Sequence, residues 1–339
     1  MEKKDFFTYA DTYYRQRYNA RQIAFRTLYN NQSQIRSFQR YCAEVLQSDT
    51  LPLSAIDAAC IHEYKAWCMN RGNCISTVNQ KLVPILSVIR RAGEEGLVPK
   101  NSSLYEAGLY LSSRPKRYGE QARNEADTKK RNRVRHLTDA QLRRLMRYYA
   151  TSSKRARNTL DIFMFSFHAC GLRVSDIVTL EWRHINFRKA TLTKVLVKTK
   201  VPIVIPLSAP ALDILGRWKA AGANPRFVFN LLPAGFDLSD DPALVKAIDY
   251  RNRALRSTLQ LIGEKIGLPF PLGMHVARHT FAVKALNSGG VSVHLISRLL
   301  GHTSVLVTEK VYATFLLPTL SRQVRSRLSF TEFQLEQRR

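Results

Sequence analysis

Apolar residues recur at spacings of three and four along most of this 339-residue chain, a pattern typical of amphipathic helices. In the first third, one stripe contains Ile35, Phe38, Tyr41, Cys42 and Val45, and a second contains Val78, Leu82, Ile85, Leu86 and Ile89. The pattern predicts a small all-helical domain over residues 1–111. Aromatic residues are dense at its start, and we expect them to pack in a core rather than to form a stacking platform for single-stranded nucleic acid.

Residues 112–135 are predicted to form a basic linker. Between Arg114 and Arg135 there are nine Lys or Arg residues against three Asp or Glu, with Pro115 and Gly119 but almost no large aliphatic residue. Such a connector could lie along a phosphate backbone, so that the two flanking domains close around a duplex. It could equally be a disordered tether.

A second domain is predicted over residues 136–317, followed by a tail over residues 318–339. Thr138 suits an N-cap before a run of helical periodicity. The exception to the helical pattern lies between about residues 190 and 207, where runs of β-branched residues are broken at Lys198-Thr199-Lys200 and at Pro202. They predict a small hairpin or a three-stranded sheet with the lysines at its tip. The tail could pack as a helix on its own domain or dock on a neighbouring protomer.

The charge of the chain points to a polyanionic partner. Lys and Arg number 53 against 26 Asp and Glu, which gives a net charge of +27 and a pI near 10.3. DNA or RNA is therefore favoured over a membrane surface, because no basic amphipathic helix or long apolar run stands out. The five cysteines are odd in number and lack paired spacing, and the amino terminus lacks a signal-peptide pattern. These features predict a cytoplasmic protein with reduced cysteines.

Six residues in the second domain together suit a covalent attack on a phosphodiester. They are Arg173, Lys198, His275, Arg278, His302 and Tyr312. Two arginines can grip the non-bridging oxygens of a phosphate bidentately. A tyrosine hydroxyl attacks poorly at neutral pH unless neighbouring positive charge or a base helps to remove its proton, and the two histidines could supply that help. A lysine held among other cations can protonate the leaving oxygen.

Each of these residues has an ordinary structural interpretation when it is taken alone. Arg173 follows a helix-ending glycine and precedes Ser175, which suits the cap of the next helix, and Asp176 lies close enough to orient the guanidinium. His275 and Arg278 are three apart and share a helix face, but His279 is a competing assignment. No Cys, Asp or Glu lies near them at zinc-ligand spacing. The joint occurrence of all the groups favours the catalytic interpretation.

The region from about Thr138 to Phe315 resembles the catalytic domain of the tyrosine recombinases, the family of phage-type integrases and Xer-like resolvases. The string GLRVSDI resembles the box of the first arginine, HVARHTFA the His-x-x-Arg box, LLGH the segment of the second histidine, and VYA the nucleophile. Lys198-Thr199-Lys200 with the strand after it resembles the hairpin lysine. The resemblance implies Tyr312 as nucleophile and Lys198 as general acid. It likewise implies a phosphate clamp of two arginines, and His275 and His302 as the hydrogen-bonding and proton-transfer pair.

The chain departs from the family pattern at two places. Members most often show nine residues from the second histidine to the tyrosine, and this chain has ten. We expect either a bulge in the path before Tyr312 or a different delivery of its hydroxyl. The hairpin also lacks the common glycine after Lys-Thr, which leaves Lys200 as a rival to Lys198. The first domain resembles the family's helical core-binding domain only in size, position and basic character.

The resemblance implies a mainly α fold, with a helical core-binding domain and an α-rich catalytic domain that carries a small antiparallel sheet, forming a C-shaped clamp around DNA. The implied activity is site-specific DNA recombination through a 3′-phosphotyrosyl intermediate, without ATP or metal, by four protomers at a synapse. We expect no separate amino-terminal arm-binding domain. Alternatives are a DNA-binding protein with a disabled site, a type IB topoisomerase-like enzyme, and an RNA-processing or membrane-surface protein.

Overall fold

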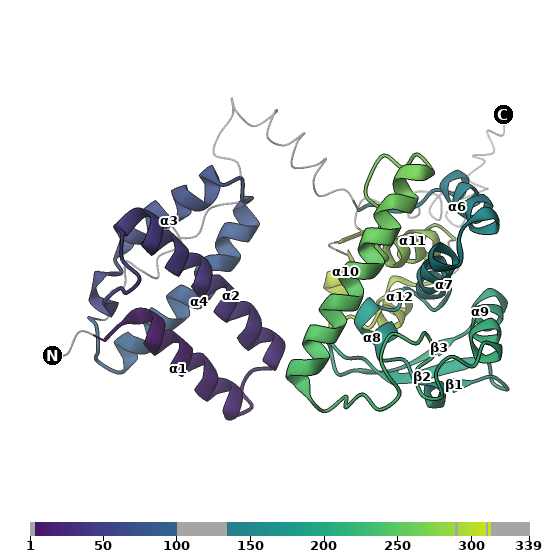
Figure 1. The fold of residues 1–339 in the computed structure, drawn as a ribbon, viewed down its shortest axis with the longest axis horizontal. Helices are drawn as coiled ribbons and strands as arrows, with labels where there is room; N and C mark the ends of the chain where they lie inside the picture. Colours follow the sequence, from purple (N-terminus) through teal and green to yellow (C-terminus); the bar gives the residue numbers. More distant parts are fainter. Residues whose placement is uncertain (1–3, 100–133, 289–290, 310, 313–339) are drawn as a thin grey trace, which may run out of the picture. The chain divides into compact units, whose positions relative to one another are not determined.

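The computed structural model describes residues 4–99, 134–288, 291–309, 311 and 312 of the chain. They fall into two compact units, Met1–Asn132 and Arg133–Arg339, each of which is described by itself (Figure 1). The predicted tail over residues 318–339 and the predicted linker, apart from its last two residues, lie outside the described residues. No helix in the described ranges is long and apolar enough to cross a membrane.

The first unit is helical throughout its described part. Its elements are α1 (Phe6–Asn19), α2 (Phe25–Tyr41), a π-helical turn η1 (Cys42–Leu46), a 3₁₀ turn η2 (Leu53–Ala55), α3 (Ala58–Asn70) and α4 (Ile75–Glu94). Asp5 caps α1 by accepting a hydrogen bond from the Thr8 amide, and its other oxygen accepts one from the Leu51 amide. The helical character predicted for this part of the chain is confirmed.

The aromatic residues near the start of the chain lie largely in the core, as expected. Phe6 is fully buried and meets Phe38 edge to face, with the two ring centroids 5.6 Å apart. Tyr14 is also buried, and its hydroxyl donates to the carbonyl of Pro84 inside α4. All five cysteines are unpaired in the structure.

The second unit combines helices with one small sheet. Its elements are α6 (Asp139–Thr151), α7 (Lys154–His168), α8 (Val174–Val178), η5 (Trp182–His184), β1 (Ile185–Asn186), β2 (Thr191–Val195), β3 (Pro202–Pro206), α9 (Ala209–Ala220), α10 (Asp241–Lys265), α11 (Met274–Asn287) and α12 (Val293–Leu299). Thr138 caps α6 within a reciprocal capping box with Gln141, which confirms the predicted helix start.

The strands form an antiparallel sheet in the order β1-β2-β3, which confirms the sheet predicted from the β-branched runs. Leu192 on β2 faces Ile205 on β3, and both side chains are fully buried. Alternation along β2 points Lys194 toward the same covered face. The tip of this hairpin carries Lys198 and Lys200, as the sequence predicted.

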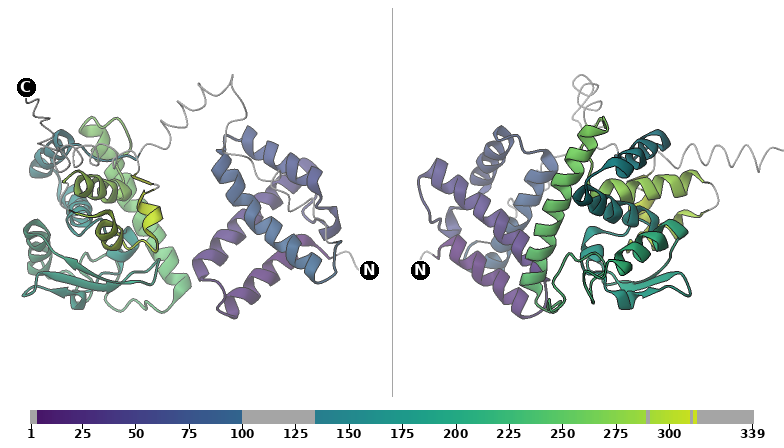
Figure 2. Two further views of the ribbon diagram at one scale, coloured as in Figure 1. Left: turned by 180° about the vertical axis from the view of Figure 1, so that it is seen from behind. Right: turned by 45° about the vertical axis from the view of Figure 1, so that its right-hand side comes forward.

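Helix α7 is the centre of the second unit. It contacts α6, α8, α9, α10 and α11, and its Leu160, Phe163 and Phe165 are fully buried. Figure 1 shows the sheet beside α9 at one end of the unit, and Figure 2 shows the long helix α10 along its side. A smaller apolar cluster lies between α11 and α12, and Tyr312 belongs to it. The candidate site therefore forms where the core of the unit meets this smaller cluster.

Candidate active site

Two arginines from distant parts of the chain converge on one backbone carbonyl. Arg278, on α11, is 7% exposed and donates from Nη1 to the Gly171 carbonyl at 2.9 Å and from Nη2 to the Leu300 carbonyl at 2.7 Å. Arg173, the N-cap of α8, donates from Nη1 to the same Leu300 carbonyl at 3.3 Å. Burial lowers the pKa of Arg278 to about 10, so the group stays charged at neutral pH.

Glycines make this convergence possible. Gly171 has φ +74°, and a Cβ on it would lie 3.1 Å from both Cα and Cγ of Arg278. Gly301 has φ +64°, and a Cβ there would overlap the side chain of Leu196 from the hairpin. Gly171 lies two residues before Arg173, and Gly301 lies directly before His302. Each glycine lets a backbone segment approach the site closely.

His302 joins the arginines to the segment that carries the tyrosine. Its Nε2 lies 2.8 Å from Nη2 of Arg278, and its Nδ1 lies 2.7 Å from Oγ1 of Thr308, which is fully buried. Desolvation, followed by the positive charge of Arg278, lowers the pKa of His302 to about 4. The imidazole is therefore neutral at physiological pH.

Tyr312 is 1% exposed, and its hydroxyl lies 2.7 Å from Nδ1 of His279. The tyrosine ring meets the imidazole edge to face, with centroids 5.7 Å apart. Burial raises the pKa of Tyr312 to about 12, although the charge of Arg278 acts in the opposite direction. Desolvation, then the neighbouring His275 and Arg278, lowers the pKa of His279 to about 4.

His275 lies on the exposed part of α11. Its pKa is lowered by desolvation of the ring and then by the positive charges of the two arginines and Lys198. Its ring centroid lies 6.3 Å from that of His279 on the same helix.

The hairpin tip is tied to α8 through Asp176. Oδ1 of this fully buried carboxylate accepts a hydrogen bond of 2.6 Å from the Val197 amide. Desolvation raises the pKa of Asp176 against the lowering effects of that bond and of nearby cations, Arg173 among them. Asp176 thus forms its hydrogen bond with the hairpin. Its effect on Arg173, the residue that we expected Asp176 to orient, is that of a nearby negative charge.

The two candidate lysines of the hairpin have different surroundings. Lys198 is exposed in the turn directly after Val197, and its charge contributes to the lowered pKa of both His275 and His302. Lys200 has φ +56° and closes the turn through its amide, which donates to the Leu196 carbonyl at 2.9 Å. Lys198 thus lowers the pKa of the two site histidines through its positive charge, and Lys200 serves the turn through its backbone.

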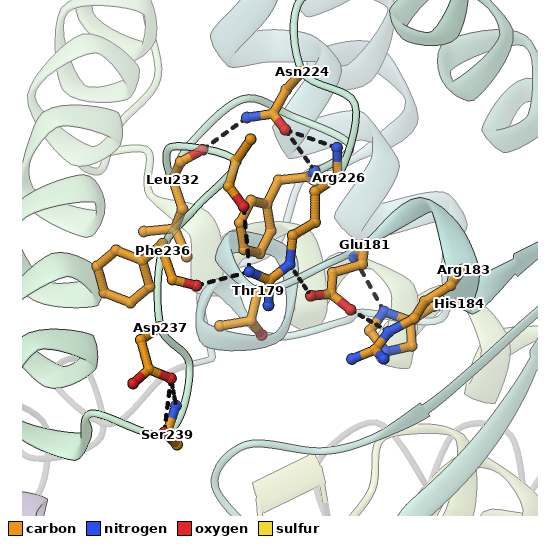
Figure 3. Close-up of polar contacts among 12 residues, drawn as sticks. Thr179, Glu181, Arg183, His184, Asn224, Arg226, Leu232, Phe236, Asp237 and Ser239 are labelled. Atoms are coloured by element: carbon orange, nitrogen blue, oxygen red, sulfur yellow. Dashed lines mark hydrogen bonds and ion pairs between the residues drawn. The ribbon is translucent and has the colours of Figure 1, made fainter.

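An ion-pair network around the buried Glu181 holds the chain that leaves α8 (Figure 3). Glu181 is 2% exposed and pairs with Arg226 at 2.5 Å and also with Arg183. Arg226 in turn donates to the carbonyl of Phe236 at 2.8 Å, which ties the loop before α10 to the same point. Lys194 donates to the Thr179 carbonyl at 2.8 Å. The network fixes the exit of α8 and thereby supports Arg173 at its start.

The structure joins Arg173 and Arg278 through the shared Leu300 carbonyl and brings His302 into contact with Arg278. Lys198 acts on His275 and His302 through its charge. Tyr312 lies beside α11, the helix that carries Arg278, but it contacts His279. The sequence offered His279 only as a competitor of His275. Thr308 and Lys194 were missed altogether. Helical spacing of four from Tyr312 could have suggested Thr308, and alternation with Leu192 could have placed Lys194 on the inner face of the sheet.

Comparisons with known proteins agree along the chain. The model of the Phage integrase family matches residues 135–316, and that of the Phage integrase SAM-like domain matches residues 5–106. The chain is 29% identical over 158 residues to the tyrosine recombinase XerC of Ralstonia pickettii (strain 12J). That match covers 42% of this chain and 45% of the relative, so it spans about half of the relative's length.

Solved structures share the fold. The integrase of transposon Tn1549 in complex with transposon right end DNA aligns with 96% of this chain and 99% of its own, at a TM-score of 0.69 and 15% identity. A lambda integrase dimer bound to a COC′ core site aligns with 91% of this chain and 95% of its own, at a TM-score of 0.60 and 18% identity. A lambda integrase tetramer bound to a Holliday junction aligns with 89% of this chain and 78% of its own, at a TM-score of 0.58 and 18% identity.

Proposed function

Because the chain belongs to the phage integrase family, we propose that it is a tyrosine-type site-specific DNA recombinase, acting in integration, excision, inversion or resolution. The observation that carries the proposal is the convergence of Arg173 and Arg278 on one carbonyl, with His302 hydrogen-bonded to Arg278 and the segment of Tyr312 attached through Thr308. Such a fixed group of cations suits a phosphate whose charge grows in the transition state.

The proposed reaction begins with attack of Tyr312 Oη on a backbone phosphorus. The bond from phosphorus to the 5′-oxygen breaks, a 3′-phosphotyrosyl bond forms, and Lys198 gives a proton to the departing 5′-oxygen. Arg173 and Arg278 hold the non-bridging oxygens. His275 and His302 form the hydrogen-bonding and proton-transfer pair, which takes up the proton that the Tyr312 hydroxyl loses. A 5′-hydroxyl from a second strand then attacks the phosphotyrosyl bond, releases Tyr312 and completes the exchange.

Lys198 is the preferred general acid, with Lys200 as its rival. Lys198 follows the residue that is anchored to Asp176, and its charge reaches the two site histidines. Lys200 serves the turn through its backbone and a left-handed conformation. These surroundings support Lys198 as the residue that reaches the leaving oxygen.

We propose that the reaction uses neither ATP nor a metal ion. The phosphotyrosyl bond keeps the energy of the broken phosphodiester, so no external energy source is needed for rejoining. Arg173, Arg278 and Lys198 can neutralise the charge that a divalent ion would otherwise carry.

The proposed partners are double-stranded DNA and further copies of the chain. A net charge of +27 suits a polyanion, and the aligned integrases are described as bound to DNA, one of them as a tetramer on a Holliday junction. We propose the same tetrameric assembly here, because exchange between two duplexes requires four cleavages. A clamp of the two units around DNA, and a cytoplasmic location with that DNA, belong to the same proposal.

The test is covalent trapping. The protein is incubated with supercoiled plasmid that carries the DNA flanking its gene, in EDTA and without ATP, and is then quenched with detergent. A nicked product linked to wild-type protein, and absent with Tyr312→Phe, is expected. Specific DNA binding without any adduct would instead favour a DNA-binding protein with a disabled site, and cleavage without exchange between two sites would favour a topoisomerase-like enzyme.

A further inference from the structure

The hydroxyl of Tyr312 is held by a histidine outside the predicted set of catalytic residues. Oη lies 2.7 Å from Nδ1 of His279, which follows Arg278 directly on α11. The two rings meet edge to face at an interplanar angle of 66°. Both a polar and an aromatic contact therefore join the nucleophile to this one side chain.

The direction of this hydrogen bond follows from burial. Tyr312 is 1% exposed, and His279 is the hydrogen-bond partner found for its hydroxyl among the described residues. A buried hydroxyl directs its proton to an acceptor, and a neutral imidazole can accept on one ring nitrogen. Nδ1 of His279 is then the acceptor, and Nε2 carries the proton.

His279 is a poor base in this arrangement. The pKa of Tyr312 is raised to about 12 by burial, whereas that of His279 is lowered to about 4 by desolvation and nearby positive groups. Because the two pKa values are shifted in opposite directions, proton transfer from the tyrosine to the histidine is unfavourable. The contact keeps the hydroxyl protonated and does not activate it.

The position of Tyr312 also keeps DNA away from it. The ring lies in an apolar cluster with Val283, Ile296 and Leu300. Attack requires the phosphorus to come within about 3–3.5 Å of Oη, which a side chain with 1% exposure does not permit. The tyrosine must therefore move, and the bond to His279 must break, before cleavage.

We propose that His279 is a positioning residue that retains Tyr312 in a buried, protonated resting position, and that releasing this contact is a step before strand cleavage. The proposal rests on the proposed function, because it takes Tyr312 as the nucleophile. Removing the acceptor leaves a hydroxyl without a partner in the buried position, so the tyrosine spends more time outside it. One hydrogen bond between neutral groups shifts such a balance by about 2- to 10-fold.

The kinetic test compares His279→Leu with His279→Asn. Leucine keeps apolar bulk without an acceptor, whereas asparagine can place its amide oxygen near the position of Nδ1. Single-turnover adduct formation is measured on a half-site built around the mapped nick, with a trapped leaving strand. We expect His279→Leu to form adduct about 2- to 10-fold faster than wild type, and His279→Asn to restore the wild-type rate. A His279→Leu rate equal to or below the wild-type rate would overturn the proposal.

A second readout does not need activity. In protein with ¹⁵N-labelled histidine, we expect His279 to be neutral with an unprotonated Nδ1, and its Nδ1 resonance to move in Tyr312→Phe. A protonated Nδ1, or a resonance that does not respond to Tyr312→Phe, would overturn the role of His279 even in an active recombinase. If wild type formed no adduct on any DNA, the proposed function would fail, and this spectrum would still decide the contact. Thermal unfolding of each variant checks that it folds.

Discussion

Nη2 of Arg278 lies 2.8 Å from Nε2 of His302, and a guanidinium can only donate, so Nε2 must accept. The proton of the neutral imidazole then sits on Nδ1 and is donated to Oγ1 of Thr308 at 2.7 Å. Thr308 thereby sets the tautomer of a site histidine and joins it to the segment of Tyr312. The same arrangement leaves His302 without a free proton until DNA displaces one of its partners.

The first prediction concerns Thr308. Thr308→Val keeps the shape of the side chain but removes the acceptor for Nδ1–H of His302. The imidazole can then change tautomer, so that an N–H at Nε2 would face the N–H donor of Arg278. We expect a loss of about 10-fold in single-turnover cleavage, equivalent to about 1.4 kcal/mol. Thr308→Ser keeps the hydroxyl and should stay close to wild type. Equal rates for the valine and serine variants would show that the hydroxyl does not matter.

The second prediction concerns Gly171. In Gly171→Ala the new methyl group would meet the backbone and side chain of Arg278 at 3.1 Å, in addition to the strain of a positive φ. We expect a destabilisation of about 2–4 kcal/mol in urea unfolding and a lower cleavage rate. Gly222→Ala is the matched control, because Gly222 has φ +60° and open space around it. Its cost should be limited to the backbone strain of about 1–2 kcal/mol.

The third prediction separates the two hairpin lysines. If Lys198 protonates the leaving oxygen, Lys198→Ala should slow cleavage of ordinary DNA by about 10²- to 10⁴-fold. A substrate in which sulfur replaces the 5′-bridging oxygen needs no general acid, because a thiolate leaves readily, and it should restore most of the rate. Lys200→Ala should behave like wild type on both substrates. Restoration of Lys200→Ala instead of Lys198→Ala would reverse the assignment.

The fourth prediction concerns pH. His279 and His302 have a pKa lowered to about 4 in the folded protein, against about 6.5 in an unfolded chain. The unfolded state therefore binds more protons between these values, so the stabilisation present above pH 6.5 is lost as pH falls toward 4. At pH 5 we expect a loss on the order of 1 kcal/mol for each histidine, after allowance for solvent screening. Urea unfolding between pH 7.5 and pH 5 measures it, and unchanged stability across that range would contradict it.

Local signals in the sequence explain how much of the fold could be predicted. The N-cap at Thr138 and the hairpin around Lys198 depend on neighbouring residues, and both are found in the structure. The grouping of Arg173 with Arg278 followed from the chemistry that a phosphate requires. The helix start and the hairpin could be predicted because each depends on residues close together in the sequence.

Contacts between distant segments could not be predicted in the same way. His275 and His279 lie about one turn apart on α11, and which of them meets Tyr312 depends on how the following segment returns to that helix. Likewise, the hydrogen bond that the Val197 amide donates to Asp176 depends on the path of a hairpin 21 residues away. Such contacts depend on tertiary packing, which cannot be read from the sequence alone.

The shared carbonyl of Leu300 has a consequence for how the two arginines can vary. Because Arg173 and Arg278 both donate to it, their guanidinium groups take their spacing from a single atom of the segment that also carries His302. A shift at the end of α12 would displace both groups together, whereas a shift of either arginine's own helix would separate them. The end of α12 thus helps to set the positions of both guanidinium groups at once.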